Sequence, residues 1–269
     1  MRHKLSFIYL FISSLGALLS CSPIAEDERL IFVEPADARR AVLIEDFTGQ
    51  RCSNCPNAAA QIAAIRAAYP EGTIVAVGVH GGPMAFAGNA RNIGLSTPLG
   101  DEYVEHWGCA NTLPKGLVNR VGQPSNPEQW TAQVAQAVAA EPVLQLEASV
   151  RLDTLEIDGA AAVTAHIAID ALGLRDVEGK LQVWLTESGI TAMQSMPDGT
   201  TNREYVHDHV LRAAVNGSWG DTFSITKGQA RQLTFGYTLD AAWKASNMAV
   251  VAFVYNEQGV QQVCEASLP

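Results

Sequence analysis

The stretch from Val42 to Ile65, VLIEDFTGQRCSNCPNAAAQIAAI, decides how the first half of the chain folds. It begins with an apolar, β-branched run, Val42–Phe47, which is long enough for one strand. A short turn leads to the CSNC motif at residues 52–55. Pro56 then fits the first turn of a helix, where a missing N–H costs nothing, and the Ala-rich run 57–69 continues that helix. The sequence therefore predicts a CxxC pair where a strand ends and a helix begins.

This placement of the two cysteines predicts redox chemistry. Cys52 is expected at the exposed end of the helix, where unpaired amides and the positive end of the helix dipole lower a thiol pKa. Arg51 adds a cation that acts in the same direction. Cys55, one turn further on and facing the interior, is expected to be the resolving thiol. The alternatives are a closed structural disulfide or half of a zinc site, although the chain has no second CxxC and no HxxxH motif.

Composition limits the classes of function. The chain has 269 residues, of which 48% are hydrophobic and 17% charged, so it is globular and long enough for two modest domains. Its formal net charge is -10, whereas nucleic-acid-binding proteins usually carry a basic face. Neither a nucleic acid nor an anionic membrane surface is therefore expected as an electrostatic partner.

Residues 1–21 are predicted to be a targeting segment. A positively charged start precedes the apolar run Leu5–Leu19, which is too short for a standing transmembrane span. The segment ends in Leu-Leu-Ser-Cys, which resembles the lipobox of bacterial lipoproteins. That resemblance implies that Cys21 is the first mature residue and carries the acyl chains, with residues 22–29 as a tether. The alternative is an ordinary secretory signal with an incidental Cys21; in both cases the compartment is oxidising, so disulfides persist.

The mature chain is predicted to contain two domains, 30–141 and 142–269. Strands and helices alternate in the first, which indicates a layered α/β domain. Pro142 follows a predicted helix and marks the boundary. In the second domain, short strand-like runs separated by turns indicate an antiparallel sandwich. The expected strands are Val143–Leu152, Ala161–Ile169, Lys180–Thr186, Arg203–Leu211, Ala230–Tyr237, Asn247–Tyr255 and Gly259–Glu265.

Two resemblances sharpen this picture. A strand, a CxxC at the head of a helix, a second strand and a proline before a third strand resemble the thioredoxin fold. The phrases VLIEDFTGQRCSNCP, VAVGVHGG, LPKGLVNR and YVHDHVLR, in this order behind a lipobox, resemble the Omp28-related outer-membrane lipoproteins of Bacteroidetes. This resemblance implies an α/β plus all-β protein at the outer membrane, with a thioredoxin-like domain followed by an Ig-like β-sandwich. Arg51 stands where thioredoxins usually have tryptophan, which leaves the substrate and the redox poise open.

Two further residues are candidates for the same site. Pro114 matches the position of the cis-proline of thioredoxin folds, and we expect a cis bond that turns Leu113 toward the cysteines and a bound peptide. His80 ends a central strand, so it is expected at the same edge of the sheet as Cys52. Its imidazole either lowers the thiol pKa and acts as a general base, or only caps the following Gly-Gly turn.

The remaining histidines and cysteines carry weaker signals. His207 and His209 fall on one face of a predicted strand with a spacing that suits two metal ligands, but no third ligand is evident, so a structural pair is favoured and no metal site is assigned. Counting leaves Cys109 and Cys264 as the remaining couple for a second disulfide. The alternative is two unrelated thiols.

The leading function is thiol–disulfide exchange on exported proteins. Cys52 attacks, a mixed disulfide forms, and Cys55 resolves it, with no cofactor expected. The partners are then the thiols or disulfides of exported proteins, together with the membrane through the lipid anchor. A second hypothesis is a non-enzymatic surface binding or assembly lipoprotein with a structural Cys52–Cys55 disulfide. A third is copper handling by Cys52, Cys55 and His80, because thiolates and imidazole suit copper.

Overall fold

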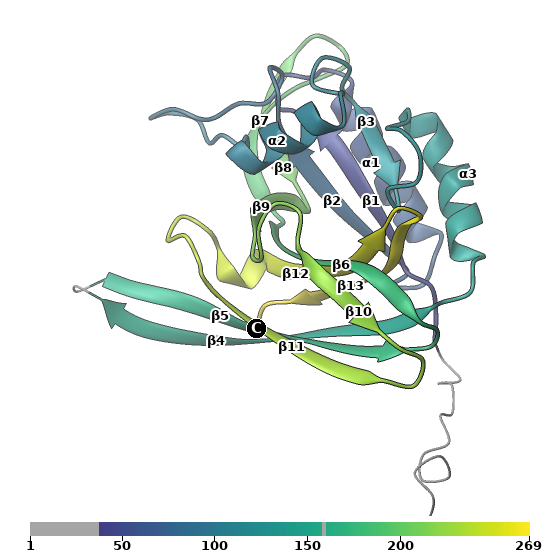
Figure 1. Cartoon of the computed structure of the whole chain (residues 1–269). Helices are drawn as coiled ribbons and strands as arrows, with labels where there is room; N and C mark the ends of the chain where they lie inside the picture. The colour runs from purple at the N-terminus through teal and green to yellow at the C-terminus, as the bar shows by residue number, and fades with distance from the viewer. Residues whose placement is uncertain (1–37, 158–159) are drawn as a thin grey trace, which may run out of the picture. The chain divides into compact units, whose positions relative to one another are not determined.

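The computed structural model describes residues 38–157 and 160–269 (Figure 1). The predicted signal segment with Cys21, the tether and the start of the predicted first domain lie outside the described residues. Within the described part of the chain, no helix is both long enough and apolar enough to cross a membrane.

The first part of the described chain alternates strands and helices, as predicted. β1 is fully buried and runs parallel to β2 on one side and antiparallel to β3 on the other. The helices α1 and α3 begin with proline in the first turn, where no backbone donor is lost. The elements are β1 (Val42–Thr48), α1 (Cys55–Ala67), β2 (Ile74–His80), α2 (Pro98–His106), β3 (Lys115–Val118) and α3 (Pro127–Val138).

The second part is almost entirely β-structure. Its strands are β4 (Leu144–Ile157), β5 (Ala160–Gly173), β6 (Val177–Glu187), β7 (Ile190–Ser195), β8 (Thr201–His207), β9 (Val210–Ala214), β10 (Asp221–Ile225), β11 (Ala230–Thr238), β12 (Met248–Asn256) and β13 (Gly259–Ser267). β7 and β10 were not expected, and the expected strand Arg203–Leu211 is divided between β8 and β9. A 3-10 turn, Ala245–Asn247, precedes β12.

One large sheet contains strands from both parts. Its order is β13-β12-β6-β9-β2-β1-β3, and β10 pairs with β6. The junction is the parallel pairing of Gly78 in β2 with Val210 in β9, where the Gly78 amide donates to the His209 carbonyl at 2.8 Å. The strands β11-β5-β4 form a second sheet, and β7-β8 form a separate hairpin. Strands on both sides of Pro142 therefore share one sheet, and the protein combines α/β structure with a layer of antiparallel β-structure.

Three hydrophobic cores hold these layers together. Alternate residues of β1 face opposite ways, so Val42 and Ile44 pack under α1 and α3, whereas Leu43 and Phe47 pack on the α2 side. We call these the α1 core and the α2 core. A third core lies between the three-stranded sheet and the large sheet and contains residues of β4, β5, β6 and β12. The fold thus buries both faces of β1 and fixes where each of its side chains points.

The expected disulfide between Cys109 and Cys264 is wrong, since both are free thiols. Cys109 belongs to the α2 core together with Val263, whereas Cys264, the next residue of β13, packs against the third core. Successive side chains of a strand face opposite sides of the sheet, so the two sulfurs are separated by the sheet itself. Burial raises the pKa of Cys109 to about 11 and that of Cys264 to about 12.

Candidate functional site

The predicted CxxC site is present as a disulfide at the start of α1. Cys52 and Cys55 are bonded, with their Cα atoms 5.5 Å apart. Cys55 is the first residue of α1, and its amide donates to the Cys52 carbonyl at 3.4 Å. The Cys52 amide in turn donates to the Gly49 carbonyl at 3.0 Å. The turn after β1 therefore delivers the pair to the amino end of the helix, as the sequence indicated.

The expected exposure of Cys52 is wrong, because both cysteines are buried, at 2% and 3% relative exposure. The β7–β8 hairpin covers this turn through Gln194, whose amide donates to the Cys52 carbonyl at 2.8 Å. The next amide along β7, that of Ser195, donates to the Gln50 carbonyl at 2.8 Å. Sequence reasoning missed this cover because a hairpin some 140 residues further along the chain carries no local signal for its docking place.

Arg51 belongs to this turn, and Pro114 lies beside the strand residue that precedes it. Arg51 is exposed, and its guanidinium lies over the ring of Phe86 at 5.0 Å. The Leu113–Pro114 bond is cis, as expected. Because Lys115 pairs with Phe47, the register places Pro114 beside the last residue of β1, next to the turn that carries the cysteines.

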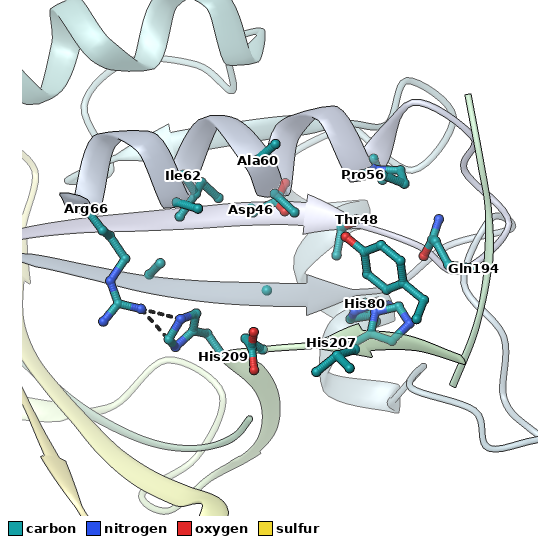
Figure 2. A pocket seen from close by; sticks show the side chains of 18 residues that line it. Asp46, Thr48, Pro56, Ala60, Ile62, Arg66, His80, Gln194, His207 and His209 are labelled. Carbon is teal, nitrogen blue, oxygen red and sulfur yellow. Dashed lines mark hydrogen bonds between the residues drawn. The ribbon is translucent and has the colours of Figure 1, made fainter. Parts of the chain in front are cut away.

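A cavity of about 500 Å³ lies beside the disulfide and is lined by Cys55. Figure 2 shows α1 along one wall, with Pro56 at the end near Gln194 and Arg66 at the other end. The strands β1 and β2 form the floor, and residues 205–209 form the opposite wall. The cavity therefore connects the start of α1 with its last turn.

Asp46 is the acidic residue of the cavity floor, and sequence reasoning did not select it. It lies on the α1 side of β1, is buried, and its Oδ1 atom has no hydrogen-bond partner. Burial raises the pKa of Asp46 to about 7, because a low-dielectric surrounding disfavours the charged carboxylate. Its signal in the sequence was a carboxylate inside a strand whose remaining pattern is that of a core strand.

His80 lies in the same cavity, at the edge where it was expected. Its ring lies 5.4 Å from that of His207 in an edge-on arrangement, and its Nδ1 atom has no hydrogen-bond partner. Burial lowers the pKa of His80 to about 3, and the charges of His207 and Arg212 act in the same direction. The imidazole is therefore neutral near pH 7 and supplies no positive charge to a thiolate.

His207 and His209 do not share a strand face, which corrects the expected strand Arg203–Leu211. β8 ends at His207, and His209 has a φ of 56°, so the chain turns before β9 begins. Both rings still line the cavity, and His209 lies against the guanidinium of Arg66 (Figure 2). Burial lowers the pKa of each ring to about 4. Among the residues that the structure describes, no group of three or more His, Cys, Asp or Glu is arranged to hold a metal ion.

Comparisons with known proteins agree with this architecture. The family model described as "Outer membrane protein Omp28" matches residues 100–268, a range that begins after the CxxC pair. The structure of HBP35 of Porphyromonas gingivalis superimposes with a TM-score of 0.63 at 17% identity, covering 86% of this chain and 76% of that chain. This likeness shows a shared fold.

Two other comparisons found a weaker structural likeness and no curated relative. A domain of the outer membrane lipoprotein Omp28 from Porphyromonas gingivalis gives a TM-score of 0.31 at 21% identity and covers 47% of this chain and 88% of that chain. No curated protein matches the chain.

Proposed function

Since the chain belongs to the Omp28 family of outer membrane proteins, we propose that it is a lipid-anchored outer-membrane protein that carries out thiol–disulfide exchange on exported proteins. In this proposal the first part is thioredoxin-like, which the order strand, CxxC, helix, strand, proline and strand supports. The second part supplies an Ig-like sandwich. In this proposal the acyl chains are attached to Cys21, which the Leu-Leu-Ser-Cys motif supports.

One observation carries the redox proposal: a buried, unpartnered carboxyl and the Cys55 of the disulfide line the same cavity. Burying a carboxylate without a partner costs stability, on the order of 4 kcal/mol for a pKa of about 7 against 3.8 for a free Asp. A structural disulfide gains nothing from such a group. A carboxyl with a pKa of about 7 is suited to take up and return a thiol proton at neutral pH.

The proposed exchange begins with the reduced pair. The Cys52 thiolate, favoured by the amino end of α1, attacks a disulfide of an exported protein and forms a mixed disulfide. Cys55 then passes its proton to the carboxylate of Asp46 and attacks the Cys52 sulfur. This step releases the substrate's second thiolate and restores the Cys52–Cys55 bond. The protein loses two electrons and its substrate gains them, without a cofactor.

Access to Cys52 in this scheme requires the β7–β8 hairpin to move. The hairpin holds the turn through the Gln194 and Ser195 bonds and pairs only within itself among the described strands. Opening it breaks a few hydrogen bonds and leaves the large sheet intact. Movement of the hairpin therefore controls the access of a protein substrate to the cysteine pair.

A second function is favoured by the burial of both sulfurs. With Cys52 and Cys55 at 2% and 3% exposure, the bond also suits a permanent structural disulfide in a surface binding or assembly lipoprotein.

A reduction-potential titration of the Cys52–Cys55 pair in the mature protein decides between the two functions. A reduction potential of roughly -120 to -270 mV supports exchange, whereas a potential below about -300 mV supports a structural disulfide.

A further inference from the structure

The floor of the cavity and the wall opposite α1 contain polar atoms that lack partners within the described protein. They are Oδ1 of Asp46, Nδ1 of His80 and Nε2 of His207, and the side chains of Asp46 and His80 are almost completely buried. Buried polar groups in native proteins nearly always have a hydrogen-bond partner. A polar group of a bound molecule would supply that partner.

The chemistry of these atoms indicates which group they would bind. The His207 ring makes hydrogen bonds with the backbone at Met193 and Ala192, and these bonds favour a proton on the ring. Nε2 takes no part in them, because it has no hydrogen-bond partner. In the neutral ring the other nitrogen is then the donor, so Nε2 presents a lone pair to the cavity. The carboxylate of Asp46 is also an acceptor. An ammonium group, with three N–H donors and a positive charge, fits between such acceptors.

The cavity is open along one side. Ala59, Ala60 and Ala63 of α1 line it and are nevertheless exposed, and Val206 of β8, opposite them, is 52% exposed. Their small or apolar side chains leave a mouth between the helix and the hairpin. A volume of about 500 Å³ accommodates a small molecule and not a folded protein.

The two sulfurs are not equivalent when approached from this cavity. Cys55 lines it, whereas Cys52 does not and is covered by the hairpin turn. A thiolate that enters the cavity therefore meets Cys55 first. Attack there leaves Cys52 as the departing thiolate at the amino end of α1, where negative charge is favoured.

We propose that the cavity binds a small aminothiol, a thiol with a nearby ammonium group, which exchanges with the disulfide at Cys55. The inference rests on the proposed redox function and adds the second substrate that resets the pair. The aminothiol thiolate forms a bond to the Cys55 sulfur, and the Cys52–Cys55 bond breaks. A second aminothiol attacks the first one's sulfur and releases Cys55 as a thiolate. Two aminothiols are oxidised to their disulfide, and the protein disulfide is reduced to two thiols.

The test compares three thiols as reductants of the oxidised mature protein. Cysteamine carries the ammonium group, 2-mercaptoethanol replaces it with a hydroxyl, and 3-mercaptopropionate replaces it with a carboxylate. Each rate is divided by that thiol's rate with a small open disulfide, which removes differences in intrinsic reactivity. We expect cysteamine to lead 2-mercaptoethanol by about ten-fold, since a charge-assisted hydrogen bond is worth that much, and the anion to be slowest.

A pair of matched variants tests the route. Ala59→Phe fills the mouth, whereas Ala64→Phe places the same ring on an exposed part of α1 that does not line the cavity. Ala59→Phe should slow cysteamine by about ten-fold or more, because a bulky ring closes the entry, and should slow exchange with a protein disulfide less than it slows cysteamine. Ala64→Phe should change neither rate.

Several outcomes would contradict the binding of an aminothiol in the cavity and leave the proposed thiol–disulfide exchange on exported proteins unaffected. They are equal normalised rates for the three thiols, an unaffected cysteamine rate in Ala59→Phe, or a cysteamine adduct on Cys52 instead of Cys55 in mass spectra of quenched reactions. Equal slowing of the cysteamine reaction and of protein-disulfide exchange by Ala59→Phe would show that the protein substrate itself occupies the cavity. A pair that no thiol reduces, with a potential below about -300 mV, defeats the proposed function instead.

Discussion

Glu45 and Asp46 are consecutive acidic residues of β1, yet one is paired with a cation and the other is not. Glu45 faces the α2 side, where Arg120 forms a buried ion pair with it at 2.8 Å. The rings of Phe253 and Tyr255 lie 4.9 and 4.6 Å from the Arg120 guanidinium. Asp46 faces the α1 side without a hydrogen bond at Oδ1. The alternation of a strand thus separates a structural acid from a chemically available one.

The unpaired acid predicts a characteristic pH dependence. The folded-state pKa of Asp46 is about 7 against 3.8 unfolded, so the folded state holds the proton more tightly, and stability falls between about pH 4 and pH 7. Asp46→Asn should therefore raise the free energy of unfolding at about pH 8, by up to about 4 kcal/mol, and change it little at about pH 4. Urea unfolding at both pH values measures this.

The same variant should slow protein-disulfide exchange by about 100-fold, the usual contribution of a proton-transferring group. The exposed Glu71→Gln is the control, because it also removes one carboxylate. Equal stability of Asp46→Asn and wild type at both pH values would contradict the raised pKa.

The paired acid predicts a loss of stability. Arg120→Met leaves Glu45 as a buried charge without its partner and should cost about 3 to 5 kcal/mol. The double variant Glu45→Gln, Arg120→Met should recover much of this loss, since no uncompensated charge remains. Denaturant unfolding of both variants measures it, and a double variant as unstable as the single one would show that the guanidinium acts through packing on the aromatic rings.

The hairpin predicts restricted access to Cys52. In the reduced protein both thiols should alkylate slowly, and Gln194→Ala should accelerate Cys52 by about ten-fold, because it removes a hydrogen bond worth about 1 kcal/mol or more to the Cys52 carbonyl. Timed labelling followed by peptide mass mapping gives both rates. Gln129→Ala on the exposed side of α3 is the matched control and should have no effect. Fast labelling of Cys52 in the wild type would show that the hairpin does not restrict access.

The lipobox predicts where the acyl chains are attached. Cys21→Ala should move the protein from the membrane fraction to the soluble fraction and abolish labelling by a fatty-acid analogue. Cys109→Ala removes a buried free thiol and should leave both unchanged. Persistent membrane association of Cys21→Ala would show that another segment anchors the protein.

The sequence alone was sufficient where the information is local. An apolar β-branched run, a turn and Pro56 in the first helical turn predicted the strand, the CxxC motif and α1, all of which the structure contains. The cis bond at Pro114 was also expected. Such features depend on a few neighbouring residues, whose backbone preferences act before any distant contact forms.

Tertiary structure decided everything that depends on which face a side chain takes and which distant strand lies beside it. Asp46, His80 and His207 meet in one cavity only because β2 pairs with β1 and β8 ends beside both. The position of β13 in the large sheet sets Cys264 on the opposite face from Cys109, and the docking of the hairpin places Gln194 of β7 over Cys52. Strand register fixes these faces, because a shift of one residue reverses every side chain, and register is set by long-range packing that no short stretch of sequence contains.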